Sequence, residues 1–180
     1  MSLIHVLEEI VTNYGVGLKD SNSEYTLTKP VSISLDQKVL VKKLHPDAVI
    51  PKYAKPGDAG FDLFAVEETV VMPGQTVIIK TGLAVAVPEG FEMQVRMRSG
   101  ASLRTPLIVA NVPGTVDSGY RGEVGIIVRN VHPTLPYTVH KGGRIAQGVI
   151  APVVTAEFTE VDELPDSERG SGGFGSTGSN

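Results

Sequence analysis

Val109–Glu123 reads Val-Ala-Asn-Val-Pro-Gly-Thr-Val-Asp-Ser-Gly-Tyr-Arg-Gly-Glu, and strand-like runs flank its centre at Leu107–Ala110 and Val124–Val128. The centre is rich in proline and glycine, the residues that let a backbone turn tightly. Two apolar runs separated by such a stretch predict a β-hairpin.

Three side chains of the hairpin are able to carry chemistry. Asp117 can accept a proton from a water. Asn111 and its neighbouring backbone groups can read the edge of a flat polar ring, and Tyr120 can pack on a sugar. Asn and Asp also close turns with their own side chains, so a purely structural role for Asn111 and Asp117 stays open.

The composition favours one all-β domain. The chain has 180 residues, with 20 glycines and 12 prolines that separate short runs rich in valine and isoleucine. Hydrophobic residues make up 41% and charged residues 20%, which suits a packed core and argues against wholesale disorder. Strands are expected at Val39–Lys43, Val70–Met72, Thr76–Thr81, Leu83–Val87, Phe91–Arg96, Leu107–Ala110, Val124–Asn130, Tyr137–Val139 and Ile145–Val153. Strands this short and numerous predict a jelly roll or a distorted β-barrel.

Three regions of the chain differ in composition and in hydrophobic pattern. Residues 1–30 form an extension of unknown role, in which Ser2–Tyr14 has the apolar spacing of a short amphipathic helix, expected to dock on its own domain. Residues 31–161 carry the strands. Residues 162–180 lose the apolar periodicity and become a Gly/Ser-rich tail, expected to be flexible.

Charge and cysteine content narrow the function classes. The net charge of −4 leaves no broad basic surface, so direct nucleic-acid binding is not expected. The absence of cysteine excludes disulfides and thiolate metal sites and fits a reducing compartment. No apolar run approaches the ~20 residues that span a bilayer, and no signal-peptide pattern opens the chain. We expect a cytoplasmic protein without a membrane partner, in the host cytoplasm if a virus encodes it.

Two further segments offer groups for phosphate chemistry. In Arg96–Arg104, arginines on a strand precede a Ser-Gly turn that is expected to open a short helix, so Arg98, Ser99 and Gly100 can form an anion site. A solvated strand end is the alternative. Gln147 can orient a water or a phosphate oxygen, although it can also simply satisfy backbone carbonyls, as can the nearby Arg144.

A carboxylate and the tail complete the candidates. Asp62 lies between two apolar residues at the start of a strand, where it can hold a water of a phosphate-bound Mg²⁺, whereas Asp58 is interpreted as a turn residue. The tail segment Arg169–Gly178 is not a Walker A loop, because no lysine follows its glycines. It is either a plain flexible end or a segment that wraps phosphates, with Phe174 covering a base.

Five segments, in this order, resemble the five motifs of the trimeric dUTP diphosphatases (dUTPases). They are Ala59–Leu63, Arg98–Gly100, the hairpin, Gly143–Gln147 and Arg169–Gly178. The resemblance implies a jelly-roll-like subunit and a homotrimer whose three active sites are each built from all three chains. It also implies Mg²⁺-assisted hydrolysis of dUTP to dUMP and pyrophosphate.

The resemblance also implies residue roles. Asp117 would activate the water that attacks the α-phosphorus, Asp62 would contact Mg²⁺ through water, and Gln147 would complete the catalytic set. Asn111 would read uracil and Tyr120 would exclude a 2′-hydroxyl. The substrate-binding set as a whole is Arg98, Ser99, Gly100, Asn111, Gly114, Thr115, Val116, Tyr120, Arg169, Gly173, Phe174, Gly175, Ser176 and Thr177.

Two alternative functions stay open, and the sequence departs from the family motifs at two positions. A dCTP deaminase-type relative, possibly bifunctional, would share the hairpin but lack the Arg-Gly-rich tail. A non-catalytic dUTP-binding or signalling trimer would bind nucleotide without releasing pyrophosphate. Gly119 stands where many relatives have an acidic residue, and Gly143 replaces a frequent aspartate, which leaves the local support of Arg144 in question.

Overall fold

The computed structural model describes residues 37–173. The helix expected at Ser2–Tyr14 and the tail residues Phe174–Thr177 therefore lie outside the described part of the chain. Within residues 37–173, no helix is long and apolar enough to cross a membrane.

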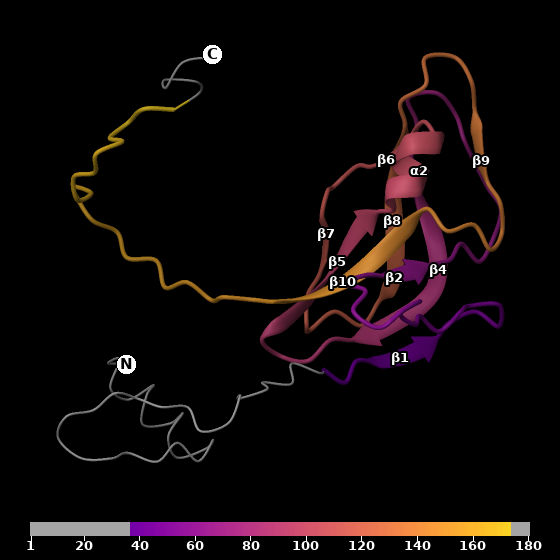
Figure 1. Ribbon diagram of the computed structural model, residues 1–180, viewed down its shortest axis with the longest axis horizontal. Helices are drawn as coiled ribbons and strands as arrows, with labels where there is room; N and C mark the ends of the chain where they lie inside the picture. Colours follow the sequence, from indigo (N-terminus) through magenta and orange to yellow (C-terminus); the bar gives the residue numbers. More distant parts are fainter. Residues whose placement is uncertain (1–36, 174–180) are drawn as a thin grey trace. The chain divides into compact units, whose positions relative to one another are not determined.

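Antiparallel strands form two four-stranded sheets and one two-stranded sheet (Figure 1). The first sheet has the order β1 (Leu40–Lys43), β4 (Thr76–Ala86), β8 (Glu123–Asn130), β6 (Leu107–Val109). The second has the order β2 (Phe61–Leu63), β10 (Ala146–Pro152), β5 (Phe91–Met97), β7 (Gly114–Val116). The small sheet pairs β3 (Thr69–Val71) with β9 (Tyr137–Val139), and the helix α2 spans Ser99–Arg104.

Alternating apolar residues of the two large sheets share one core. In β8, Val124, Ile126 and Val128 are buried, while the residues between them are more exposed. Met93 and Val95 of β5 belong to the same buried cluster. Since side chains alternate across a strand, each sheet turns one apolar face inward. The expected all-β, jelly-roll-like class is confirmed.

Two details of the predicted strands are wrong. Thr76–Thr81 and Leu83–Val87 were expected as separate strands, but β4 runs through Gly82, whose φ is +65°, and its pairing with β8 shifts register there. The glycine makes an irregularity inside one strand instead of a break between two.

The hairpin is also more elaborate than predicted. Its two arms pair as expected, since Val109 of β6 lies opposite Val128 of β8. The connection is not a simple turn, because it contains β7, which pairs with β5 in the other sheet. Thr115 and Val116 are β-branched and suit a strand, although proline and glycine before them suggest a turn.

Candidate active site

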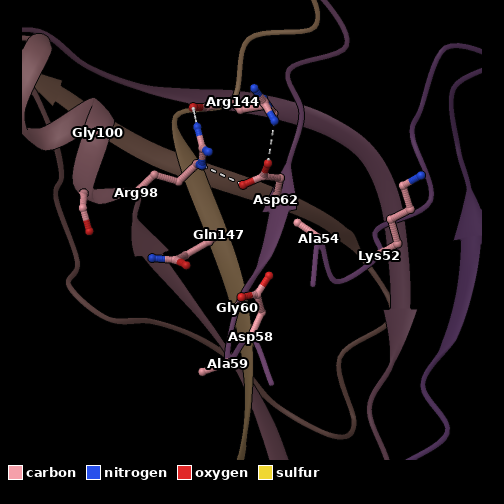
Figure 2. Close-up of a pocket in the computed structure, with 11 residues that line it drawn as sticks. Lys52, Ala54, Asp58, Ala59, Gly60, Asp62, Arg98, Gly100, Arg144 and Gln147 are labelled. Atoms are coloured by element: carbon pink, nitrogen blue, oxygen red, sulfur yellow. Dashed lines mark hydrogen bonds and ion pairs between the residues drawn. The ribbon is translucent and has the colours of Figure 1, made fainter. Parts of the chain in front are cut away.

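The pairing of β2, β10 and β5 brings three of the predicted segments together. Gln147 in β10 lies opposite Asp62 of β2 on one side and Arg96 of β5 on the other. Arg98 follows the end of β5, directly before α2. A pocket of about 460 Å³ opens at this point (Figure 2). It is lined by Lys52, Ala54, Asp58, Ala59, Gly60, Asp62, Arg98, Ser99, Gly100, Arg144 and Gln147.

Asp62 is the electrostatic centre of this pocket. Its Oδ1 lies 2.6 Å from Arg98 Nε, and its Oδ2 accepts a hydrogen bond from Arg144 Nη1 at 3.0 Å. Arg98 Nη1 also donates to the Arg144 carbonyl at 3.1 Å. Figure 2 shows the two guanidinium groups meeting the carboxylate from different directions. Charge-assisted pairs of this kind fix arginine side chains in space, so the pocket presents oriented anion-binding groups.

Gln147 is held against the strand end beside Asp62. Its Nε2 donates to the Met97 carbonyl at 3.2 Å. A Cβ atom at Gly60 would collide with the Gln147 side-chain oxygen. The absence of a side chain at Gly60 thus leaves room for the Gln147 amide in the pocket.

Three charged residues that line this pocket do not belong to the predicted site. Arg144 was noted in the sequence but not assigned, and the structure pairs it with Asp62. Lys52 lines the pocket from the loop before β2, and no motif marked it. Asp58 is confirmed as a turn residue, since its Oδ2 accepts the Lys55 backbone N–H at 2.8 Å, and it also lines the pocket.

The question of how Arg144 is supported next to Gly143 has a structural answer. The Gly143 N–H donates to the His140 carbonyl at 2.8 Å, and a Cβ atom at position 143 would lie 2.8 Å from that same oxygen. No side chain fits there without a backbone shift. Asp62 supplies the carboxylate that Arg144 needs.

A second, smaller cavity of about 120 Å³ lies beside β7 and β8. Its lining includes the predicted base-reading and sugar-contacting residues Asn111, Gly114, Thr115, Val116 and Tyr120. The Tyr120 hydroxyl donates to the Glu123 carbonyl at 3.0 Å, which fixes the ring at the cavity edge. The hairpin thus borders a small recess, in which the predicted base-reading and sugar-contacting residues lie together.

Asp117 lies in neither of these pockets within one chain. It is exposed and lines a third hollow together with Thr115 and Ser118. Its backbone carbonyl accepts the Tyr120 N–H at 3.0 Å, which is a contact of the backbone and leaves the proposed turn-closing role of the Asp117 side chain a prediction. Arg169 and Gly173 of the tail line none of the three hollows.

The side chains of the first pocket suit a metal ion that binds together with the phosphates of a ligand. Residues 37–173 contain no group of three or more His, Cys, Asp or Glu side chains arranged to hold a metal ion. Mg²⁺ bound to phosphates keeps several waters and needs only one or two carboxylates, and Asp62 is such a carboxylate.

Outside the pocket, the Lys141 ammonium group donates a hydrogen bond to Asp47 and thereby lowers the pKa of that carboxyl.

The fold and the pockets define an all-β protein with one pocket in which two arginines meet a carboxylate and a separate, smaller recess beside the hairpin. Comparison with family models is more specific: the model described as dUTPase matches residues 46–178. The chain belongs to the dUTPase family.

Curated relatives and solved structures agree with this assignment. The deoxyuridine 5′-triphosphate nucleotidohydrolase of Thermobifida fusca is 50% identical over 141 residues, covering 78% of this chain and 79% of the relative. The enzyme of the same name from Picosynechococcus sp. is 51% identical over 136 residues, covering 76% and 95%.

Phage proteins share the structure. The Staphylococcus bacteriophage 80alpha dUTPase with dUPNHPP is 35% identical, with a TM-score of 0.74 over 80% of this chain and 100% of that one. The structure of a mutant dUTPase from phage phi11 of S. aureus describes the coordination of a structural Mg(II) ion in that protein. It is 29% identical to this chain with a TM-score of 0.67, covering 72% of this chain and 100% of that one.

Proposed function

We propose that this chain hydrolyses dUTP to dUMP and pyrophosphate. The observation that carries the proposal is the family match over residues 46–178, which includes the pocket where two arginines converge on Asp62. The reaction removes dUTP, which limits uracil incorporation into DNA, and supplies dUMP for dTMP synthesis. As part of this proposal, the enzyme acts in the cytoplasm, or in the host cytoplasm if a virus encodes it.

The phosphates bind in the first pocket, called the arginine pocket from here on because Arg98 and Arg144 line it. Arg98 and Arg144 supply oriented guanidinium groups, and Ser99 supplies a hydroxyl in the same lining. Phosphoryl chemistry depends mostly on positioning and on neutralising charge, which these groups provide. Gln147 orients a phosphate oxygen or the attacking water.

Uracil and the sugar bind in the smaller recess. Asn111 and the backbone near Gly114 face the base, and the Tyr120 ring stands where a 2′-hydroxyl would be. Asp117 accepts the proton of the water that attacks the α-phosphorus.

Asp62 would hold Mg²⁺ through a water when the ion binds together with the triphosphate. When bound, the ion supplies neutralisation of the charge on the phosphate oxygens. Asp62 is suited to contact the ion, because it is the carboxylate of the pocket that pairs with both arginines.

The complete site is shared by the three chains of a homotrimer. Within one chain Asp117 and Arg98 line different hollows, so the proton acceptor and the phosphate site need a partner to meet. In this arrangement one chain gives the arginine pocket, a second gives the hairpin and a third gives the tail with Arg169 and Phe174. Closed cyclic symmetry is the usual form of soluble homo-oligomers.

A nucleotide panel tests the proposal. Pyrophosphate release is measured with dUTP, dCTP, dTTP and UTP in the presence of Mg²⁺. We expect hydrolysis of dUTP far above the other three, because a wrong exocyclic group leaves polar atoms unpaired in the recess. Ammonia release from dCTP would indicate the deaminase-type relative, and tight dUTP binding without pyrophosphate would indicate a binding protein.

A further inference from the structure

The position of the Tyr120 ring depends on the residues that follow it. Its hydroxyl donates to the Glu123 carbonyl at 3.0 Å, and Glu123 is itself anchored, since its Oε1 accepts the Gly82 N–H at 2.7 Å. Arg121 braces the same turn by donating to the Ser118 carbonyl at 2.6 Å. The ring therefore lies back across the turn, toward the Glu123 carbonyl.

Gly122 provides the space in which the ring lies. A Cβ atom at position 122 would lie 2.6 Å from Tyr120 Cζ and closer still to the hydroxyl oxygen. Non-bonded atoms at such a separation repel strongly, since optimal contacts lie near 3.5–4.0 Å. Gly122 does not have the left-handed φ that favours glycine. Glycine is thus required at position 122 for the ring and not for the backbone.

A side chain at position 122 would displace the ring at little cost to the fold. Tyr120 is 45% exposed, so its ring can rotate toward solvent without opening the core. The displaced ring loses the Glu123 carbonyl and leaves the edge of the recess that it shares with Asn111 and Gly114.

We infer that Gly122 is a specificity-determining residue that acts through Tyr120 to reject ribonucleotides. The inference rests on the proposed function. A nucleotide with a 2′-hydroxyl needs one more oxygen of space at the sugar, and the ring denies that space only where Gly122 lets it lie. Rejection of a single added hydroxyl by an apolar wall is typically worth about 10²-fold.

The experiment compares two glycines of the same turn in the full-length chain. Gly122→Ala is measured against Gly119→Ala, because Gly119 also lacks a left-handed φ and a Cβ atom there would meet nothing within 4 Å. For each chain, kcat/KM is determined for dUTP and for UTP, and thermal unfolding checks the fold. We expect Gly122→Ala to reduce the dUTP:UTP ratio at least ~10-fold and Gly119→Ala to leave it unchanged.

A double-mutant cycle shows whether Gly122 acts through the ring. In a Tyr120→Ala background there is no ring to displace, so adding Gly122→Ala should leave the dUTP:UTP ratio where Tyr120→Ala put it. A general structural defect would lower the ratio or the activity further. Tyr120→Phe removes the hydrogen bond to the Glu123 carbonyl but leaves the space at Gly122. If that space places the ring, this variant retains most of the discrimination, and a ratio as low as that of Tyr120→Ala overturns the inference even where Gly122→Ala folds poorly.

The outcomes separate the inference from the function it rests on. Wild-type chain that discriminates dUTP from UTP, with the same ratio in Gly122→Ala, overturns the inference alone. Additive effects of Gly122→Ala and Tyr120→Ala overturn it as well. Wild-type chain that does not hydrolyse dUTP overturns the proposed function and the inference together.

Discussion

At the scale of single residues, the arginine pocket already contains an anion of its own. Asp62 engages both Arg98 and Arg144, and its side chain is 23% exposed. An incoming phosphate needs the same two guanidinium groups. Without Mg²⁺, the carboxylate therefore opposes phosphate binding by competition and by like-charge repulsion.

Asp62→Asn should strengthen the binding of inorganic pyrophosphate in the presence of EDTA. We expect a gain of about 5-fold, equivalent to about 1 kcal/mol of repulsion removed at a partly exposed site. Isothermal titration calorimetry measures it. The same variant should gain less than the wild type when Mg²⁺ is added, since the carboxylate for its water is missing.

Asp58→Asn is the matched control for this change. It removes the same charge from the same pocket, but the Asp58 carboxylate binds the Lys55 N–H and no arginine. An equal gain in both variants would mean a general field effect. Equal or weaker pyrophosphate binding by Asp62→Asn would mean that its role in orienting the arginines outweighs competition.

Which residues meet was only partly predictable at this scale. Asp62 at the start of a strand and Gln147 at an apolar strand entry belong to two separate motifs of the resemblance, and the sheet register does place them side by side. The Asp62–Arg144 pair joins positions 82 residues apart, and no local pattern signals it. The role of Gly122 is local in sequence, yet it depends on a side-chain orientation that composition does not specify.

At the scale of elements, alternation predicted most strands and the Ser-Gly turn predicted α2 correctly. The failures occur where glycine or proline does not end an element. Gly82 bends β4 without breaking it, and the Pro-Gly step in the hairpin leads into β7. In both cases pairing with a neighbouring strand outweighs the local preference for a turn.

The tail is the element whose role a truncation tests. Arg169 is exposed, and its Nε donates to the Gly172 carbonyl at 3.0 Å, so it is available to exchange this contact for a phosphate. Ending the chain after Glu168 should lower kcat for dUTP at least ~10-fold, because a charge-assisted contact and the expected stacking of Phe174 are lost together. Steady-state kinetics measure the loss, and size-exclusion chromatography should show an unchanged assembly. Full activity of the shortened chain would mean that the tail is a plain flexible end.

At the scale of the whole molecule, the chain keeps its functional groups apart. Arg98 lines the large pocket, Asp117 lines a different hollow, and Tyr120 borders the small recess. A sequence read along one chain puts these residues in one list without saying which of them meet. The proposed homotrimer would bring them together, because in a symmetric assembly each chain can give one part to each of several identical sites.

Hybrid assemblies provide the test of shared sites. Asp117→Asn removes the proton acceptor and should lower kcat by about 10²–10⁴-fold, with dUTP still bound. A chain ending after Glu168 keeps Asp117 and lacks the tail. If a site takes Asp117 from one chain and the tail from another, equal mixing with free exchange should leave about a quarter of the sites intact. Activity should then rise above that of either parent.

Two mixtures make this result decisive. In the first, Asp117→Asn chains are exchanged with shortened chains, and exchange is verified by mass spectrometry of the intact complexes. In the second, Asp117→Asn chains are exchanged with shortened chains that also carry Asp117→Asn, so no site can regain the carboxylate. Recovery in the first mixture alone shows that Asp117 and the tail reach one site from different chains. If verified exchange brings no recovery, one chain must supply both groups, because a hybrid then never contains a site with the carboxylate and the tail together.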